Sequence, residues 1–89
     1  MSRPWIDLEM IGIPLGAVLT HADRPSETCV VVQLSPPRVV FRWEVLSLTD
    51  AATKAYDGKY EAKTVAVWLY NGESLQDRRN RFESYHRPR

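Results

Sequence analysis

The clearest succession of structural signals lies between residues 47 and 75, where a polar start and an alanine-rich run are followed by a glycine and then by an apolar run. Ser47 or Thr49 can accept hydrogen bonds from the free N–H groups of a first helical turn, and Asp50 suits the positive end of the helix dipole. Alanines favour the helix that follows, and Gly58 is typical of a helix end. The pattern therefore predicts a helix over residues 47–58.

Two further elements are predicted after this helix. The run Thr64–Tyr70 is rich in β-branched and aromatic residues, which favours a strand. Asn71-Gly72 closes the run, and this pair is well suited to a tight turn with positive φ. Ser74 then offers a cap for a last helix, which we expect to continue to residue 84.

The first half of the chain has the alternation of hairpin strands. Trp5–Ile11 carries apolar residues at spacings that fit a short amphipathic helix, which Gly12 can end. Ala17–His21 and Thr28–Leu34 are predicted strands, and the polar segment Asp23–Glu27 supplies the turn between them. Both faces of the second strand are largely apolar.

A third strand is predicted over Arg38–Leu46, after two prolines that interrupt the preceding strand. Period-two alternation places four apolar residues on one side of it: Val39, Phe41, Trp43 and Val45. Hairpin strands with helices segregated around them predict an α+β fold, with a small, mostly antiparallel sheet of about four strands and two or three short helices. We expect a single domain over residues 1–89.

Composition adds the broad class of protein. The chain has 89 residues, 44% of them hydrophobic and 26% charged, as in an ordinary globular domain. Its apolar runs fall far short of the roughly twenty residues that cross a bilayer, and the N-terminus lacks a basic region followed by an apolar segment, so we expect a cytoplasmic protein. Cys29 is the single cysteine, which excludes an internal disulfide and favours a buried, inert thiol.

Charge is unevenly distributed along the chain. Residues 1–45 carry four Arg against five acidic residues, or −1, whereas residues 46–89 carry eight Lys or Arg against six acidic residues, or +2. Five arginines lie near the C-terminus: Arg78, Arg79, Arg81, Arg87 and Arg89. Arginine suits bidentate phosphate pairing, so these residues are candidates for nucleic-acid contact. The alternative is a solvated helix end whose cations complement the helix dipole.

No arrangement of residues indicates catalysis. His21 and Asp23 resemble a base with its orienting carboxylate, but two positions apart at a strand end they are typical of a solvated turn. Cys29 lies within a valine-rich run, where burial raises the pKa of a thiol. We therefore expect a protein that is not an enzyme, with no catalytic residue, no cofactor and no metal.

The aromatic residues divide into two groups. Trp43 and Trp68 each lie within a predicted strand, and a small domain with two Phe needs large side chains in its core, so we expect both to be buried. Tyr70 directly precedes the Asn71-Gly72 turn, so its ring can either pack in the core or stack on a nucleobase or a partner. Tyr70 and Asn71 thus join the arginines as candidate nucleic-acid-binding residues.

Three short motifs resemble the RAMA domain, the restriction-enzyme adenine-methylase-associated module. They comprise a lead-in with Gly12, Gly16 and Leu19, a helix with Ser47, Leu48, Ala51, Ala52, Ala55 and Gly58, and an ending with Trp68, Tyr70, Asn71, Gly72, Ser74 and Leu75. The resemblance covers residues 6–79 and leaves a basic C-terminal helix and tail over residues 75–89. Two departures are Lys63-Thr64-Val65 in place of the family's Asn-Gly-Trp, and Ser35-Pro36-Pro37 in place of its Asp-Gly.

The resemblance implies a role beside DNA. RAMA domains are modules of DNA modification, restriction and repair proteins, and are thought to assist recognition of DNA, including modified DNA. We therefore expect a non-enzymatic, nucleic-acid-associated accessory module. The alternative is a small phage or mobile-element protein that docks on a DNA-modification or defence complex through exposed edge strands or aromatic residues. The expected partner is DNA or a DNA-processing protein, with no membrane, and a homodimer is possible because the core is small.

Overall fold

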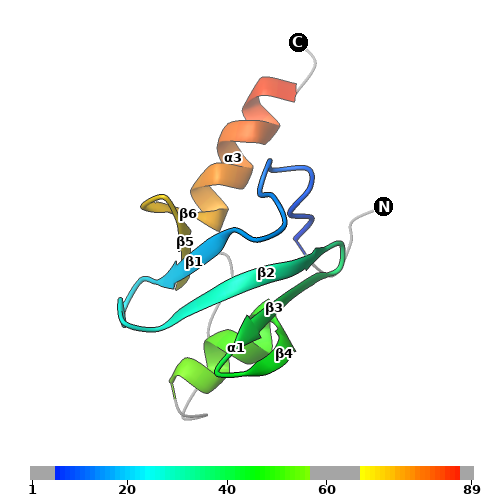
Figure 1. Cartoon of the computed structure of the whole chain (residues 1–89). Coiled ribbons are helices and arrows are strands. Elements are labelled where there is room, and N and C mark those ends of the chain that lie inside the picture. The colour runs from blue at the N-terminus through cyan, green and yellow to red at the C-terminus, as the bar shows by residue number, and fades with distance from the viewer. Residues whose placement is uncertain (1–5, 57–66, 87–89) are drawn as a thin grey trace.

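The computed structural model describes residues 6–56 and 67–86, which contain six strands and the helices α1 and α3 (Figure 1). In chain order the elements are β1 (Val18–His21), β2 (Thr28–Leu34), β3 (Pro37–Phe41), β4 (Glu44–Ser47), α1 (Leu48–Ala55), β5 (Trp68–Tyr70), β6 (Glu73–Ser74) and α3 (Leu75–His86). Figure 1 shows the two helices near opposite ends of the sheet, α1 beside β3 and α3 beside β5 and β6.

All six strands belong to one sheet in the order β4-β3-β2-β1-β5-β6, and every neighbouring pair is antiparallel. The first four strands are joined by hairpins, and β5 returns along the free side of β1. The predicted α+β class with an antiparallel sheet is confirmed. The sheet has six strands rather than about four because the predicted third strand divides into β3 and β4, and the pair Glu73–Ser74 adds β6.

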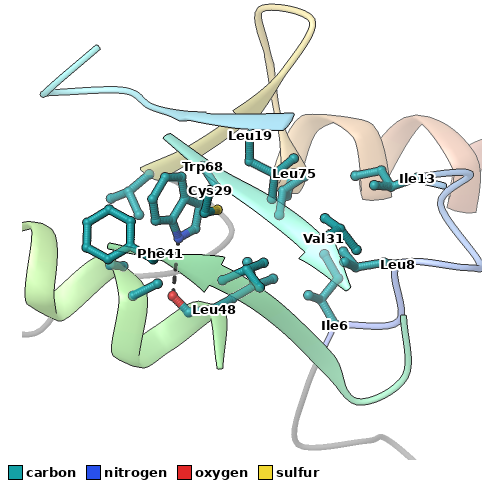
Figure 2. Close-up of a cluster of buried hydrophobic side chains, with 14 of the residues drawn as sticks. Ile6, Leu8, Ile13, Leu19, Cys29, Val31, Phe41, Leu48, Trp68 and Leu75 are labelled. Atoms are coloured by element: carbon teal, nitrogen blue, oxygen red, sulfur yellow. Dashed lines mark hydrogen bonds between the residues drawn. The ribbon is translucent and has the colours of Figure 1, made fainter. Parts of the chain in front are cut away.

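One face of the sheet forms the hydrophobic core. Leu19, Val31 and Phe41 point into it from three adjacent strands, and each has at most 1% of its surface exposed. Trp68 on β5 is fully buried, as predicted, and its indole N–H donates a hydrogen bond of 3.2 Å to the carbonyl oxygen of Leu48 at the start of α1 (Figure 2). This bond satisfies both the buried indole and a backbone carbonyl, so the tryptophan joins the sheet to α1.

Both helices begin where the sequence indicates. The Ser47 hydroxyl accepts a hydrogen bond of 3.1 Å from the N–H of Asp50, so Ser47 caps α1. Ser74 caps α3 in the same way, by accepting from Asp77 at 3.1 Å. The tight turn before Ser74 is also confirmed, with Asn71 at φ 53° and Gly72 at φ 82°. The predicted helix end at Gly58 and the start of the strand predicted from Thr64 lie outside the described residues.

The predicted N-terminal helix is wrong within the described residues, because residues 6–12 form turns instead. The Asp7 carboxylate accepts a hydrogen bond of 3.0 Å from the N–H of Glu9, and the N–H of Ile13 donates to the carbonyl of Leu8 at 3.0 Å. Gly12 has a φ of 74°, which reverses the chain. Packing of the apolar residues Ile6, Leu8, Ile11 and Ile13 in the core therefore outweighs the helical spacing of this segment.

The predicted continuous strand over residues 38–46 is also wrong. Arg42 and Trp43 have φ values of 50° and 70°, the backbone of a two-residue hairpin turn between β3 and β4. Val39 and Phe41 lie in the core as predicted, whereas Trp43 is 98% exposed. The turn restarts the alternation, so Val45 falls on the face of the sheet opposite the core.

Candidate interaction surface

The outer face of the sheet, which we define as the face opposite the core, carries a row of four valines across four strands. Val18 is the Cα partner of Val30, Val30 of Val40, and Val40 of Val45. Val18, Val30 and Val45 are 53%, 38% and 60% exposed, and Val40 is half-buried. Exposed single apolar residues are normal on a protein, but a contiguous row on a sheet face is typical of a contact surface.

Val32 on β2 is a further exposed apolar residue, two positions after Val30 and next to a register shift. The pairing of β2 with β3 is irregular between Val31 and Gln33. Val31 is buried in the core, whereas Val32 is 44% exposed and Leu34 packs against the core again. Both faces of this strand were recognised as apolar in the sequence, but an exposed apolar face was not predicted from that pattern.

Trp43 stands in the turn of the β3–β4 hairpin, close along the chain to the last valine of the row. It lies two positions before Val45 on β4, and 98% of its surface is exposed. Its φ of 70° is one that bulky residues rarely adopt, because the Cβ crowds the backbone there. The second tight hairpin of the chain uses Asn71-Gly72, which fits this backbone without strain. At Trp43 the chain therefore combines backbone strain with full exposure of its largest apolar side chain.

Charged residues lie on either side of the valine row, an ion pair near the hairpin tip and one arginine at the opposite side. At the hairpin tip Arg42 donates two hydrogen bonds to the Glu27 carboxylate, at 2.6 and 3.3 Å, so these two charges neutralise each other. Arg38 is exposed at the other side of the row, two positions before Val40 on β3. No hydrogen bond or ion pair joins Arg38 to any of the described residues. Within residues 6–56 and 67–86, the outer face thus has one unpaired positive charge, that of Arg38.

Among the predicted nucleic-acid-binding arginines, Arg78 is held inside the molecule. Its guanidinium donates to the carbonyl oxygen of Ile11 at 2.6 Å and to that of Gly12 at 3.3 Å. It also lies over the rings of Tyr70 and Phe82, with a distance of 5.1 Å to each ring centroid. The side chain is only 15% exposed, so Arg78 fastens the N-terminal turn to α3.

Arg81 is paired with a carboxylate of the sheet. Its guanidinium donates to both oxygens of Glu73, at 2.8 and 3.0 Å, and Arg78 reaches the same carboxylate at 3.4 Å. The hydrogen bond from Arg81 and the positive charges of both arginines lower the pKa of Glu73. The cluster of Arg78, Arg81 and Glu73 has two positive charges and one negative charge, and Arg81 remains 48% exposed.

The remaining candidates are placed differently. Arg79 is half-buried on α3, and its Nε is buried with no hydrogen-bond partner among the described residues. Asn71 is exposed in the β5–β6 turn, and Tyr70 is half-buried under Arg78. Arg87 and Arg89 lie outside the described residues. The structure thus brings Tyr70, Arg78 and Arg81 together around Glu73.

The prediction that His21 belongs to a solvated turn is wrong, because its side chain is fully buried. Its Nδ1 accepts hydrogen bonds from the backbone N–H groups of Asp23, at 3.1 Å, and Arg24, at 3.2 Å, which leaves the proton of the neutral ring on Nε2. The Asp23 carboxylate accepts instead from the Tyr56 hydroxyl. Burial lowers the pKa of His21, and its ring contacts the rings of Tyr56 and Trp68 edge to face, so it contributes to packing.

The thiol of Cys29 is buried, as predicted. It is 1% exposed in the core, and this burial raises its pKa to about 12. A thiol with this pKa stays protonated at neutral pH, which makes it a poor nucleophile. In the described ranges no three His, Cys, Asp or Glu side chains are arranged to hold a metal ion, and no helix is long and apolar enough to cross a membrane.

Comparison of the chain with known protein families, with curated proteins and with solved structures found no match. The resemblance to the RAMA domain therefore stays a prediction based on its motif residues. The outer face and Trp43 are features that sequence reasoning missed, because nothing in the pair Arg42-Trp43 is typical of a turn.

Proposed function

We propose that this chain is a protein-interaction module whose contact surface is the outer face of the sheet, with Trp43 as its anchor. The observation that carries the proposal is the 98% exposure of Trp43, at a φ of 70°, next to the exposed valine row. Tryptophan is the residue type most enriched among the side chains that dominate binding energy at interfaces. Unfavourable backbone conformations in non-glycine residues cluster at binding sites.

The chemistry of this surface favours a protein partner over a nucleic acid. Exposed valines gain free energy when another apolar surface removes them from water, and phosphates cannot provide that surface. Arg42 is neutralised by Glu27, so among the described residues of this surface Arg38 is the unpaired cation that could attract a polyanion. A surface that binds phosphates usually carries several positive charges, and this surface has one. The family resemblance favours a setting for this module among DNA-modification or defence proteins.

A photo-crosslinking amino acid at position 43, introduced in cells that naturally produce the protein, tests this proposal. We expect covalent adducts with protein, identified by mass spectrometry, at position 43. The matched control is the same amino acid at Gln76, which is exposed on α3 away from the outer face. Adducts at position 76 without adducts at position 43 would contradict the proposal.

A nucleic-acid-binding function is a second candidate, supported by the net positive charge of the cluster of Arg78, Arg81 and Glu73. Fluorescence anisotropy with plain and methylated duplexes, at low and moderate salt, tests it. A phosphate contact predicts affinity that falls steeply with salt and weakens in Arg81→Ala. Arg78 is a poor probe, because its removal disturbs the N-terminal turn. Absence of binding at low salt would eliminate this candidate.

A further inference from the structure

We infer that the partner of the outer face is a second copy of this chain, packed face to face about a two-fold axis that runs along the valine row. This inference rests on the proposed role of the outer face in protein contact. Two sheets whose exposed faces are lined by β-branched residues pack in this way in β-sandwiches. A two-fold axis is the commonest symmetry of protein oligomers.

The positions of Trp43 and Arg38 relative to the row carry the inference. Val40 and Val45 are opposite each other on β3 and β4. Arg38 precedes Val40 by two residues and Trp43 precedes Val45 by two residues, and the strands are antiparallel. Arg38 and Trp43 therefore lie on opposite sides of the row, Arg38 about 7 Å from it along β3 and Trp43 in the turn just before β4.

A two-fold axis along the row exchanges these two sides. The axis places each valine of the row against its own copy. It also brings Trp43 of one chain over Arg38 of the other chain. An indole is the best aromatic partner for a guanidinium. The unpaired cation and the exposed indole of one molecule thus complement those of the other, and symmetry forms the contact twice.

The other charges on this face do not oppose the arrangement. Arg42 at the hairpin tip approaches the partner's Arg38, but Glu27 neutralises Arg42 through its two hydrogen bonds. Glu44 does not lie on the outer face, because it is the strand partner of core-facing Phe41 and pairs with Lys54 of α1. The apolar area that the outer face can bury in the dimer is modest, so we expect the dimer to have a dissociation constant in the micromolar range.

Sedimentation equilibrium from low micromolar to millimolar concentration tests this inference. We expect the wild-type chain to form a dimer, Trp43→Gly to weaken it by at least about 30-fold, and Arg38→Ala to weaken it by about 5-fold. Glycine suits the backbone at position 43, so Trp43→Gly is expected to fold. A dimer that is unchanged by Trp43→Gly would overturn the proposed interface.

Crosslinking with a short bis-maleimide locates the interface independently. Val45 lies on the proposed axis, so Val45→Cys is expected to crosslink to its own copy, whereas Met10→Cys, at a position 69% exposed and away from the outer face, is not. The native Cys29 is buried and does not compete. Equal crosslinking of both variants, or a wild-type monomer at every concentration, would overturn self-association. If the wild-type chain is a monomer, the proposed protein-interaction function is still decided by the separate photo-crosslinking experiment at position 43.

Discussion

Replacing Trp43 with glycine is expected to stabilise the isolated fold, although it deletes the largest side chain of the β3–β4 hairpin. The indole is 98% exposed, so its removal takes away almost no packing inside the molecule. The φ of 70° is one that glycine adopts without the steric conflict of a Cβ. A function in binding explains why a tryptophan stands at a position where glycine is more stable.

The size of the effect is estimated from the difference in free energy of unfolding between glycine and alanine at position 43. A left-handed backbone costs a residue with a Cβ about 1 kcal/mol or more, whereas the greater freedom of glycine in the unfolded chain costs about 0.5 to 1 kcal/mol. At position 43 these terms oppose each other, and we expect Trp43→Gly to be more stable than Trp43→Ala by about 0.5 to 1 kcal/mol. In a domain of this size the difference corresponds to a melting temperature higher by about 2 to 8 °C.

Thermal unfolding by circular dichroism, at concentrations below those of self-association, measures this difference. The matched control is Val45, an exposed strand residue on the same hairpin. There the order is expected to reverse, with Val45→Ala more stable than Val45→Gly, because a strand suits alanine better than glycine. If Trp43→Ala were more stable than Trp43→Gly, the strain ascribed to position 43 would be refuted.

Three further changes test the interior of the fold. Trp68→Phe is expected to lower the free energy of unfolding by about 2 kcal/mol in urea denaturation, because it leaves the Leu48 carbonyl without the indole hydrogen bond and leaves unfilled volume. The pKa of His21 is lowered from its ordinary value of 6.5, so the folded state favours the neutral ring. The free energy of unfolding is therefore expected to fall as the pH drops below 6.5. A His21→Leu variant whose stability falls equally steeply over this range would contradict this assignment. Arg78→Ala is expected to cost about 2 kcal/mol and to expose amides near Ile11 in hydrogen exchange, whereas unchanged protection there would exclude Arg78 as the residue that holds this turn.

Local signals predicted much of the fold. The strands β1 and β2, both helix caps and the Asn71-Gly72 turn were each indicated by neighbouring residues whose preferences agree with the final structure. The segment of residues 6–12 was not predictable in this way. Its apolar spacing fits a helix, but packing of Leu8 and Ile13 in the core decides its path.

The β3–β4 hairpin was missed for a related reason. Alternation of apolar residues continues from Val39 through Val45 without a turn residue, so the sequence predicts one strand with Trp43 in the core. The turn at Arg42 and Trp43 becomes visible only in the structure, where it moves Trp43 and Val45 out of the core. A turn that lacks turn residues is a local conflict of the kind expected at a functional site.

The candidate arginines show the same limit of sequence reasoning. Their number near the C-terminus was evident, but their partners were not. Glu73 binds Arg78 and Arg81 because β6 ends directly before α3, and the carbonyl oxygens of Ile11 and Gly12 come from the far end of the chain. Ion pairs and hydrogen bonds of this kind depend on tertiary structure.

Oxidative footprinting of Trp43 tests most directly whether the outer face is an interaction surface. Hydroxyl radicals are applied to the dilute purified protein and to cells that naturally produce it, and oxidation at Trp43 is compared with oxidation at Met10, which is 69% exposed and outside the proposed surface. We expect Trp43 to be oxidised readily in the dilute protein and protected in cells, while Met10 reacts in both. Equal oxidation of Trp43 in the two conditions would contradict the proposed role of this surface.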